Sequence, residues 1–201
     1  MYGGMDRSKE PTLREGDERL IAQAMGAFGT REKASDVWFE QGRKFYLADD
    51  LSTAMKRFNQ AWLLNPKNPK PFWGFAMVLH DQGHAIRAEE QMATAFALDL
   101  RLVEFLADYG RIATVCTVED PNLSPAVKTA YMEKSEQMYR MAEEVAPTSP
   151  YLYENWATAL YWSGDYYGAW RKVALAEKYG GHSSAKFLGM LAKKLPRPKG
   201  V

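Results

Sequence analysis

Two histidines four positions apart are the first residues whose spacing suggests chemistry. His80 and His84 would share one face if a single helix carried both, and two histidines so placed can bind zinc. Gly83 lies between them, however, and glycine is typical of a turn. We therefore expect His80 to face a groove and His84 to cap the next helix, and we predict neither a metal site nor a cofactor.

The lone cysteine and the paired carboxylates are the other candidates for catalysis. Cys116 would be reactive if a positive neighbour lowered its pKa, but its apolar flanks predict a small buried side chain. Glu89-Glu90 and Glu143-Glu144 lie at helix positions expected to face solvent. A phosphate-binding loop, dinucleotide-binding glycines and a nucleophile elbow are not found in a suitable context. The sequence therefore predicts a protein that is not an enzyme.

Composition narrows the classes of partner and the location. With 201 residues and 46% hydrophobic content, the chain can form one core or a short array of packed repeats. Lys and Arg number 26 against 25 Asp and Glu, and this balance argues against nucleic-acid binding. No window approaches the roughly 18 apolar residues that span a bilayer, so we expect no membrane insertion. The chain as written looks cytoplasmic; a periplasmic protein whose leader was removed would look the same.

The helices that must position these side chains repeat at a period of about 34 residues. In the first match, large and small residues follow one another as Trp38, Gly42, Phe45, Ala54, Phe58, Ala61 and Pro66. The same sizes return one period later at Phe72, Phe75, Ala76, Leu79, Ala88, Met92 and Ala95. They return again at Tyr153, Trp156, Ala157, Leu160, Ala169, Val173 and Ala176. This pattern resembles the tetratricopeptide repeat (TPR) family, whose members stack helical hairpins into a solenoid.

The spacing has a physical reason. The first helix of each unit carries a small residue, such as Gly42, that lets a large side chain of the second helix approach closely. The second helix has small residues two turns apart, such as Ala54 and Ala61. Turns between the helices are predicted at 49–50, 82–84 and 163–165. The predicted fold class is all-α, a TPR-type helical-hairpin solenoid of about four repeats.

The expected organisation places terminal segments around the repeats. A polar segment over 1–16 is expected to be flexible, and a capping helix is expected over 17–34. The solenoid spans 35–182, with repeats at 35–68, 69–102, 103–149 and 150–182. A C-terminal capping helix over 183–195 is expected to begin at Ser183 or Ser184 and to stop before Pro196, with a tail over 196–201.

The third repeat is interrupted. Gly110 and Ser135 are 25 residues apart, whereas the matching Gly42 and Ala54 are 12 apart, an excess of 13. The insertion, 114–126, carries β-branched residues and two prolines, so it is predicted to lengthen the loop between the two helices, with Ser124 and Pro125 starting the second. It is either a tolerated loop extension or a functional element.

The family resemblance implies a concave groove, lined by the first helices, that binds an extended peptide or a partner helix. Transferred by register, the predicted partner-binding residues are Phe39, Arg43, Tyr46, Lys70, Trp73, Met77, His80, Arg111, Tyr151, Glu154, Thr158, Tyr161 and Trp162. Glu104 and Ala107 share this register. Phe39 and Arg43 stand where carboxylate-clamping members have Lys and Asn, so a receptor for chaperone tails is not expected.

The predicted function is a non-enzymatic scaffold or adaptor for protein–protein interaction. An aromatic groove that contains methionine fits an apolar or amphipathic segment of a protein or peptide partner. Two alternatives stay open, a self-associating module that forms a homo-oligomer within a larger assembly and a secretion-chaperone-like binding protein. The aromatic residues also have a plainer interpretation, which is packing between hairpins.

Overall fold

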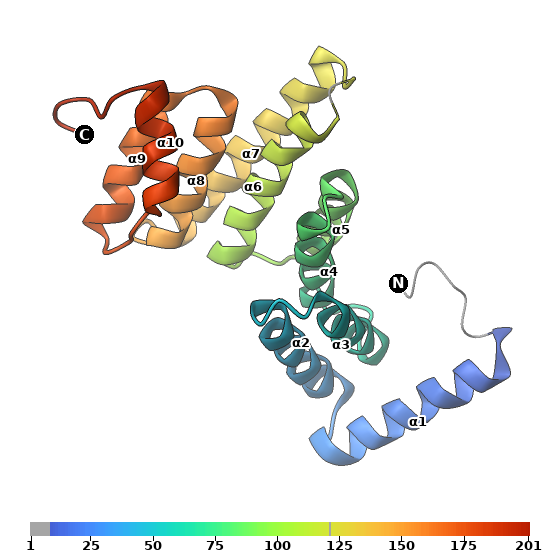
Figure 1. Ribbon diagram of the computed structural model, residues 1–201. Helices are drawn as coiled ribbons and strands as arrows, with labels where there is room; N and C mark the ends of the chain where they lie inside the picture. The colour runs from blue at the N-terminus through green and yellow to red at the C-terminus, as the bar shows by residue number, and fades with distance from the viewer. Residues whose placement is uncertain (1–8, 121) are drawn as a thin grey trace. The chain divides into compact units, whose positions relative to one another are not determined.

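The computed structural model describes residues 9–120 and 122–201, and its regular elements are α-helices (Figure 1). They are α1 (Pro11–Phe28), α2 (Arg31–Leu47), α3 (Leu51–Leu64), α4 (Lys70–Asp81), α5 (Ala85–Ala97), α6 (Val103–Glu119), α7 (Pro125–Val145), α8 (Pro150–Ser163), α9 (Tyr166–Lys178) and α10 (Ala185–Lys194). The chain forms two compact units. The first holds the residues up to Gln82 with Glu90–Leu100, and the second holds Gly83–Glu89 with Arg101–Val201.

In the first unit, α2 and α3 form a hairpin whose helix starts are capped by side chains. The Thr30 hydroxyl accepts a hydrogen bond from the Lys33 amide at 3.2 Å, and Asp50 accepts one from the Thr53 amide at 3.0 Å. Each cap satisfies an amide that would otherwise lack a partner in the first turn. The hydrogen bonds from Thr53 also hold the pKa of Asp50 below its usual range.

Close packing in this unit centres on Phe58 of α3, which is fully buried. A Cβ atom added to Gly42 of α2 or to Gly74 of α4 would lie 2.5 Å from a carbon of the Phe58 ring. Both helices therefore approach the ring at distances that only glycine permits. This is the arrangement of small against large residues that the sequence pattern indicates for Gly42.

Helix α1 begins earlier than expected. Pro11 occupies its first turn, where the fixed φ of proline favours a helix, and Arg14 pairs with Glu18 one turn on at 3.8 Å. The expectation of a flexible segment is therefore wrong for residues 11–16, while residues 1–8 lie outside the described part of the chain. The helix ends at Gly29, whose φ of 81° stops it, and α2 starts at Arg31 instead of Ser35.

In the second unit, α6 and α7 form one hairpin and α8 and α9 form another. Tyr139 of α7 is fully buried, and a Cβ atom on Gly110 of α6 would lie 2.7 Å from its ring. The ring also stacks on Trp156 of α8 with centroids 5.3 Å apart. Tyr139 thus joins the two hairpins through a single aromatic contact of the kind that adds about 1 kcal/mol to area burial.

The 13 extra residues of the α6/α7 hairpin are mostly helical, and the prediction of a long loop is wrong. Helix α6 continues nine residues past Gly110, whereas α8 continues six past Ala157. Helix α7 has ten residues before Ser135, whereas α9 has three before Ala169. The connecting loops have five and two residues. Three extra residues therefore lengthen α6, seven lengthen α7 and three lengthen the loop.

The added helix ends have identifiable partners. Ser124 caps α7 by accepting a hydrogen bond from the Val127 amide at 3.4 Å, as the sequence indicates. At the end of α6, Glu119 Oε2 accepts a hydrogen bond from the Ile86 amide at 3.0 Å. Since Ile86 lies in the first turn of α5, the lengthened α6 supplies a cap for the start of that helix.

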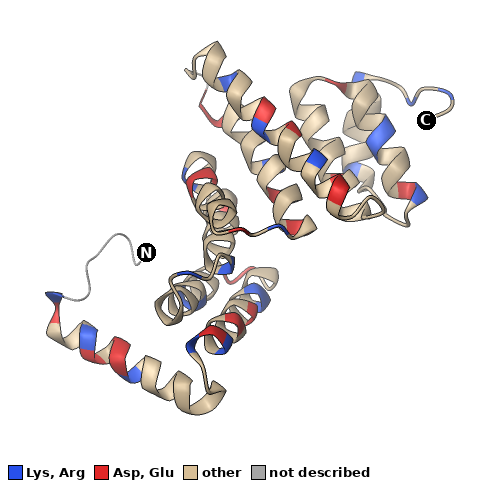
Figure 2. Ribbon diagram, turned by 180° about the vertical axis from the view of Figure 1, so that it is seen from behind, with Lys and Arg blue, Asp and Glu red and all other residues tan. Residues whose placement is uncertain are grey.

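Both units carry charge of both signs, and Figure 2 shows acidic and basic residues interspersed along their helices. Helix α10 lies within the residues expected for a C-terminal helix, with the Ser184 hydroxyl accepting a hydrogen bond from the Phe187 amide at 3.2 Å. Across the described residues, no helix has both the length and the apolar character needed to cross a bilayer.

Candidate partner-binding site

Helix α8 carries five of the predicted groove residues, and local sequence fixes both of its ends. Pro150 opens the helix, and the Ser149 hydroxyl accepts a hydrogen bond from the Leu152 amide at 3.4 Å. Gly164 ends it in the left-handed conformation, at φ 88°, which glycine adopts without a steric penalty. The helix therefore presents a rigid row of side chains between two fixed ends.

Two aromatic side chains on α8 are unusually exposed. Tyr151 is 40% exposed and Trp162 is 53% exposed. They are 11 positions apart, and Thr158 lies between them at helical spacing, so the three share one face over three turns. We call this row the outer face of α8. Large aromatic groups left in water are typical of surfaces that bind another molecule.

A buried carboxylate fixes Tyr151 against α6. The Tyr151 hydroxyl donates to Asp108 Oδ1 at 2.6 Å, and Arg111 lies 3.5 Å from the same oxygen. Asp108 is only 2% exposed, so its charge needs these two partners. The sequence predicts Arg111 and Tyr151 as groove residues, and the structure brings them together around Asp108. Asp108 is not among the predicted residues, although it stands four positions after Glu104 in the same helical row.

Two further predicted residues on α8 have structural contacts. Glu154 Oε1 accepts a hydrogen bond from the His182 amide at 2.7 Å, which holds the loop before α10. The Thr158 hydroxyl donates to the Glu154 carbonyl at 3.0 Å within the helix. Both side chains remain partly exposed. They can therefore contact a partner, but Glu154 already has one structural role.

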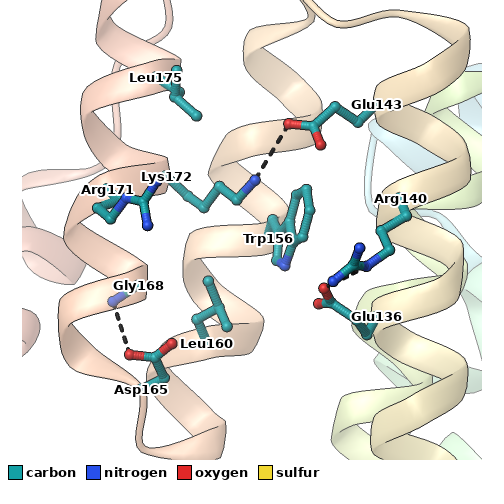
Figure 3. Close-up of a pocket in the computed structure, with 10 residues that line it drawn as sticks. All are labelled: Glu136, Arg140, Glu143, Trp156, Leu160, Asp165, Gly168, Arg171, Lys172 and Leu175. Atoms are coloured by element: carbon teal, nitrogen blue, oxygen red, sulfur yellow. Dashed lines mark hydrogen bonds and ion pairs between the residues drawn. The ribbon is translucent and has the colours of Figure 1, made fainter.

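On its other side, α8 forms the floor of a cavity of about 380 Å³ that the sequence does not predict (Figure 3). Helices α7 and α9 form the walls. The lining residues are Glu136, Arg140, Glu143, Trp156, Leu160, Asp165, Gly168, Arg171, Lys172 and Leu175. Acidic and basic residues are both common on the surfaces of helices. The charged residues of α7 and α9 therefore do not predict a cavity between these helices.

Lys172 crosses this cavity from α9 to α7. Its Nζ lies 3.4 Å from Glu143 Oε1 and 3.1 Å from the centre of the Trp156 ring. Burial lowers the pKa of Lys172, and the nearby Glu143 carboxylate opposes that shift. The same Glu143 oxygen accepts a hydrogen bond from the Tyr153 hydroxyl at 3.1 Å. Lys172 and Glu143 are therefore engaged with each other and with aromatic groups.

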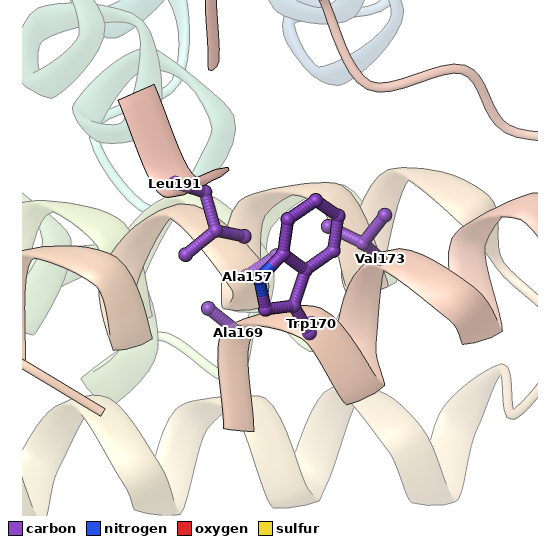
Figure 4. Packing of buried hydrophobic residues seen from close by; sticks show 5 residues of the cluster. All are labelled: Ala157, Ala169, Trp170, Val173 and Leu191. Atoms are coloured by element: carbon purple, nitrogen blue, oxygen red, sulfur yellow. The ribbon is translucent and has the colours of Figure 1, made fainter. Parts of the chain in front are cut away.

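Tyr161, a predicted groove residue, belongs mainly to the packing of the last hairpin. Its ring centroid lies 5.7 Å from that of Tyr166 and 5.8 Å from that of Phe187 on α10. It packs against the core cluster Ala157, Ala169, Trp170, Val173 and Leu191, in which Leu191 of α10 points at Trp170 (Figure 4). Changing Tyr161 would therefore disturb the C-terminal cap as well as any partner contact.

In the first unit, three of the predicted groove residues lie in the core. Phe39 is 1% exposed, and its ring lies 5.6 Å from Phe58 and 5.9 Å from Trp73 between centroids. Trp73 and Met77 are also buried. The assignment of Phe39 to a binding surface is therefore wrong, and Trp73 and Met77 expose too little to anchor a partner. Aromatic side chains at groove positions here fill the space between α2, α3 and α4.

The remaining predicted residues of the first unit are more accessible. Arg43 is exposed and lies 3.7 Å from Glu40, and Lys70 lies 3.0 Å from Asp36. Tyr46 and His80 are partly exposed. These residues are polar or only half accessible, and none combines a large ring with the exposure of Trp162. Within the first unit, the predicted residues do not form an exposed aromatic surface.

The residues whose types suggested metal binding or catalysis lie at a turn or in the core. Helix α4 ends at Asp81 and Gly83 adopts a φ of 77°, so His80 and His84 lie on either side of a turn. Cys116 is buried, and burial raises the pKa of its thiol to about 12, which keeps it protonated at neutral pH. Among the residues that the structure describes, no three His, Cys, Asp or Glu side chains gather as metal ligands.

No protein-family model matches the chain, and a search of curated proteins gives no match. Solved structures do match. The chain is similar to TTC0263, a thermophilic TPR protein of Thermus thermophilus, with a TM-score of 0.66 and 17% identity over 80% of each chain. It is also similar to a chain of the APC/C hetero-tetramer Cut9-Hcn1, with a TM-score of 0.60 and 14% identity, covering 94% of this chain and 33% of that one.

A third similar structure is PilF of Pseudomonas aeruginosa, with a TM-score of 0.43 and 18% identity over 81% of this chain and 85% of that one. At such low identities, the two stronger likenesses show a shared fold. The all-α TPR-type solenoid predicted from the repeats is therefore confirmed. The chain spans a third of the length of the Cut9-Hcn1 chain that it matches.

Proposed function

We propose that this protein is a non-enzymatic scaffold that binds an apolar or amphipathic segment of a partner protein along the outer face of α8. The observation that carries the proposal is the exposure of Tyr151 and Trp162 on one side of a helix with fixed ends. Rigid aromatic groups bury a large area with little loss of side-chain entropy, and they dominate the binding energy of many interfaces. Two such anchors three turns apart match the length of a short helix or an extended peptide.

The surroundings of the two anchors support specific binding. Tyr151 is held by Asp108, and Trp162 contacts Tyr161 with ring centroids 5.3 Å apart. Anchors that are already ordered lose less entropy when a partner binds. Thr158 and Glu154 between them offer polar contacts that would fix the register of a bound segment.

The non-enzymatic part of the proposal is supported by how the reactive groups are engaged. The Cys116 thiol is buried, and Asp108 and Glu143 are used by tyrosines and by basic side chains. The proposal of a protein partner agrees with the similar Cut9-Hcn1 structure, which is itself a hetero-tetramer. A TPR fold serves as a binding surface because its stacked hairpins offer one side chain row per repeat.

Affinity capture from the native source tests the proposal. The bait is the full chain, compared with a Tyr151→Ser/Trp162→Ser variant and with Tyr167→Ser as the control, since Tyr167 is also 53% exposed but lies on α9. We expect a partner that is retained by wild type and by the control and lost with the double variant. Equal capture by all three proteins would contradict the α8 site, and a stable homo-oligomer that excludes the partner would favour self-association.

A further inference from the structure

In the cavity between α7, α8 and α9, some hydrogen-bond donors of the lining side chains do not donate to the acceptors of the cavity. Its lining includes three basic and three acidic side chains, so charge alone does not select a ligand. Two of the carboxylates already accept: Glu136 from Arg140 at 2.9 Å, and Asp165 from the Gly168 amide at 2.8 Å. The third, Glu143, accepts from Lys172 and from Tyr153 through one oxygen.

The two guanidinium groups of the cavity can each donate further hydrogen bonds. Arg140 uses its Nε for Glu136, which leaves its two Nη groups. Arg171 makes no ion pair or hydrogen bond with any residue that the structure describes. Figure 3 shows the two side chains on opposite walls, Arg140 on α7 and Arg171 on α9. A guanidinium group with free donors is matched in geometry to a carboxylate.

The floor between these walls is apolar. Leu160 and Trp156 of α8 lie beneath the opening, and Leu175 of α9 borders it at the far end (Figure 3). Lys172 covers the Trp156 ring, so the accessible apolar surface is mainly that of the two leucines. The unused guanidinium N–H groups and the two leucines therefore favour a ligand that offers an anionic group beside an apolar one.

We propose that this cavity is a second binding site, which takes an acidic side chain of a partner-protein segment between Arg140 and Arg171, with an apolar neighbour on Leu160 and Leu175. The site shares no side chain with the outer face of α8, so the scaffold would bind two segments independently. The acidic group gains charge-assisted hydrogen bonds from both walls, and the apolar neighbour gains burial.

The test uses the full chain and three capped synthetic peptides of equal length in which Leu residues are combined with Asp, with Asn or with Lys. Binding is measured by calorimetry, and NMR signals of the Arg140 and Arg171 Nε–H groups and of the Trp156 indole locate the peptide. We expect the Asp peptide to bind and to shift these signals. Arg140→Gln and Arg171→Gln should each weaken it about tenfold, since a hydrogen bond to a charged group is lost.

Arg19→Gln is the matched control, because Arg19 is an exposed arginine of α1 outside the cavity, and its affinity should equal that of wild type. The proposal is overturned if the Asn or Lys peptide binds as tightly as the Asp peptide, if none binds, or if Arg171→Gln behaves as the control does. Sodium acetate is the last control, because it offers a carboxylate group without a peptide. If it shifts the same signals at the same concentration as the peptide, the cavity is an adventitious anion site only and the proposal fails.

Discussion

The α6/α7 and α8/α9 hairpins share a register but solve the same packing problem differently. In α6/α7, Gly110 faces the large ring of Tyr139, whereas at the matching positions of α8/α9 Ala157 faces the smaller Val173. The largest partner thus stands opposite glycine, as Phe58 does opposite Gly42 in the first unit. The size of one residue in a pair therefore limits the size of the residue that it faces.

The largest effect on stability is expected from removing the Tyr139 ring from the contact between α6 and α7. Tyr139→Ala should lower the free energy of unfolding by about 3–5 kcal/mol, because a buried ring that also stacks on Trp156 is lost. Val173→Ala at the matching position should cost only about 2 kcal/mol. Denaturant unfolding of the two variants measures the difference, and equal losses would show that the two contacts do not differ as described.

The next largest effect is expected from giving each hairpin the small residue of the other, alanine at position 110 and glycine at position 157. Gly110→Ala places a Cβ atom against the Tyr139 ring and should cost about 1–3 kcal/mol, whereas Ala157→Gly should cost about 1 kcal/mol through helix propensity. The double variant Gly110→Ala/Tyr139→Val copies the α8/α9 pair. Its loss of unfolding free energy should be smaller than the sum of the two single losses, and strict additivity would contradict the size limit between the facing residues.

The added helical residues of α6/α7 give a smaller expected effect. Glu119→Ala removes the acceptor of the Ile86 amide and should cost about 1 kcal/mol, a typical value for the loss of a helix cap. Hydrogen exchange at the Ile86 amide should accelerate in the same variant. Glu133→Ala is the control, because Glu133 is an exposed acidic residue of α7. The cap is disproved if Ile86 exchanges equally fast in both variants.

The smallest effect lies at the end of the α8/α9 hairpin and depends on pH. The Arg197 guanidinium, 2.7 Å from Glu177, lowers the pKa of that carboxyl from its usual 4.5. A lowered pKa in the folded state stabilises the protein above pH 4.5, and the contribution is lost as the pH falls through the lowered value. The pair is half exposed, so Glu177→Gln should cost only about 0.5 kcal/mol at neutral pH. In thermal unfolding the cost should vanish in acid; a constant cost would contradict the ion pair.

Residues that repeat were predictable, because their spacing is fixed by the hairpin geometry itself. The pattern of small and large residues identified the fold and the close contact at Gly42, and residue types identified Ser124 as a cap and Gly164 as part of a turn. The insertion could not be assigned from residue types. Its β-branched residues have weak helix propensity, but α6 holds them in the helix through its packing on α7, and tertiary context overrides propensity there.

The candidate site was predictable in part. Register alone gives the direction of a side chain from its helix and not how much of it neighbouring helices cover. Tyr151 and Phe39 were therefore predicted as equals, yet Tyr151 is 40% exposed and Phe39 lies under Trp73. The buried Asp108 and the cavity beside Arg171 depend on contacts between helices far apart in the sequence, for which a single chain carries no periodic signal.

Partner binding by the outer face of α8 is tested by the affinity of the captured partner for Trp162→Ser, measured by calorimetry beside wild type and Tyr167→Ser. Both substitutions remove an equally exposed aromatic ring, so a general loss of surface hydrophobicity affects them alike. We expect Trp162→Ser to raise Kd at least about tenfold, as for an interface hot spot, while Tyr167→Ser leaves Kd unchanged. Equal Kd values for Trp162→Ser and wild type would contradict partner binding by the outer face of α8.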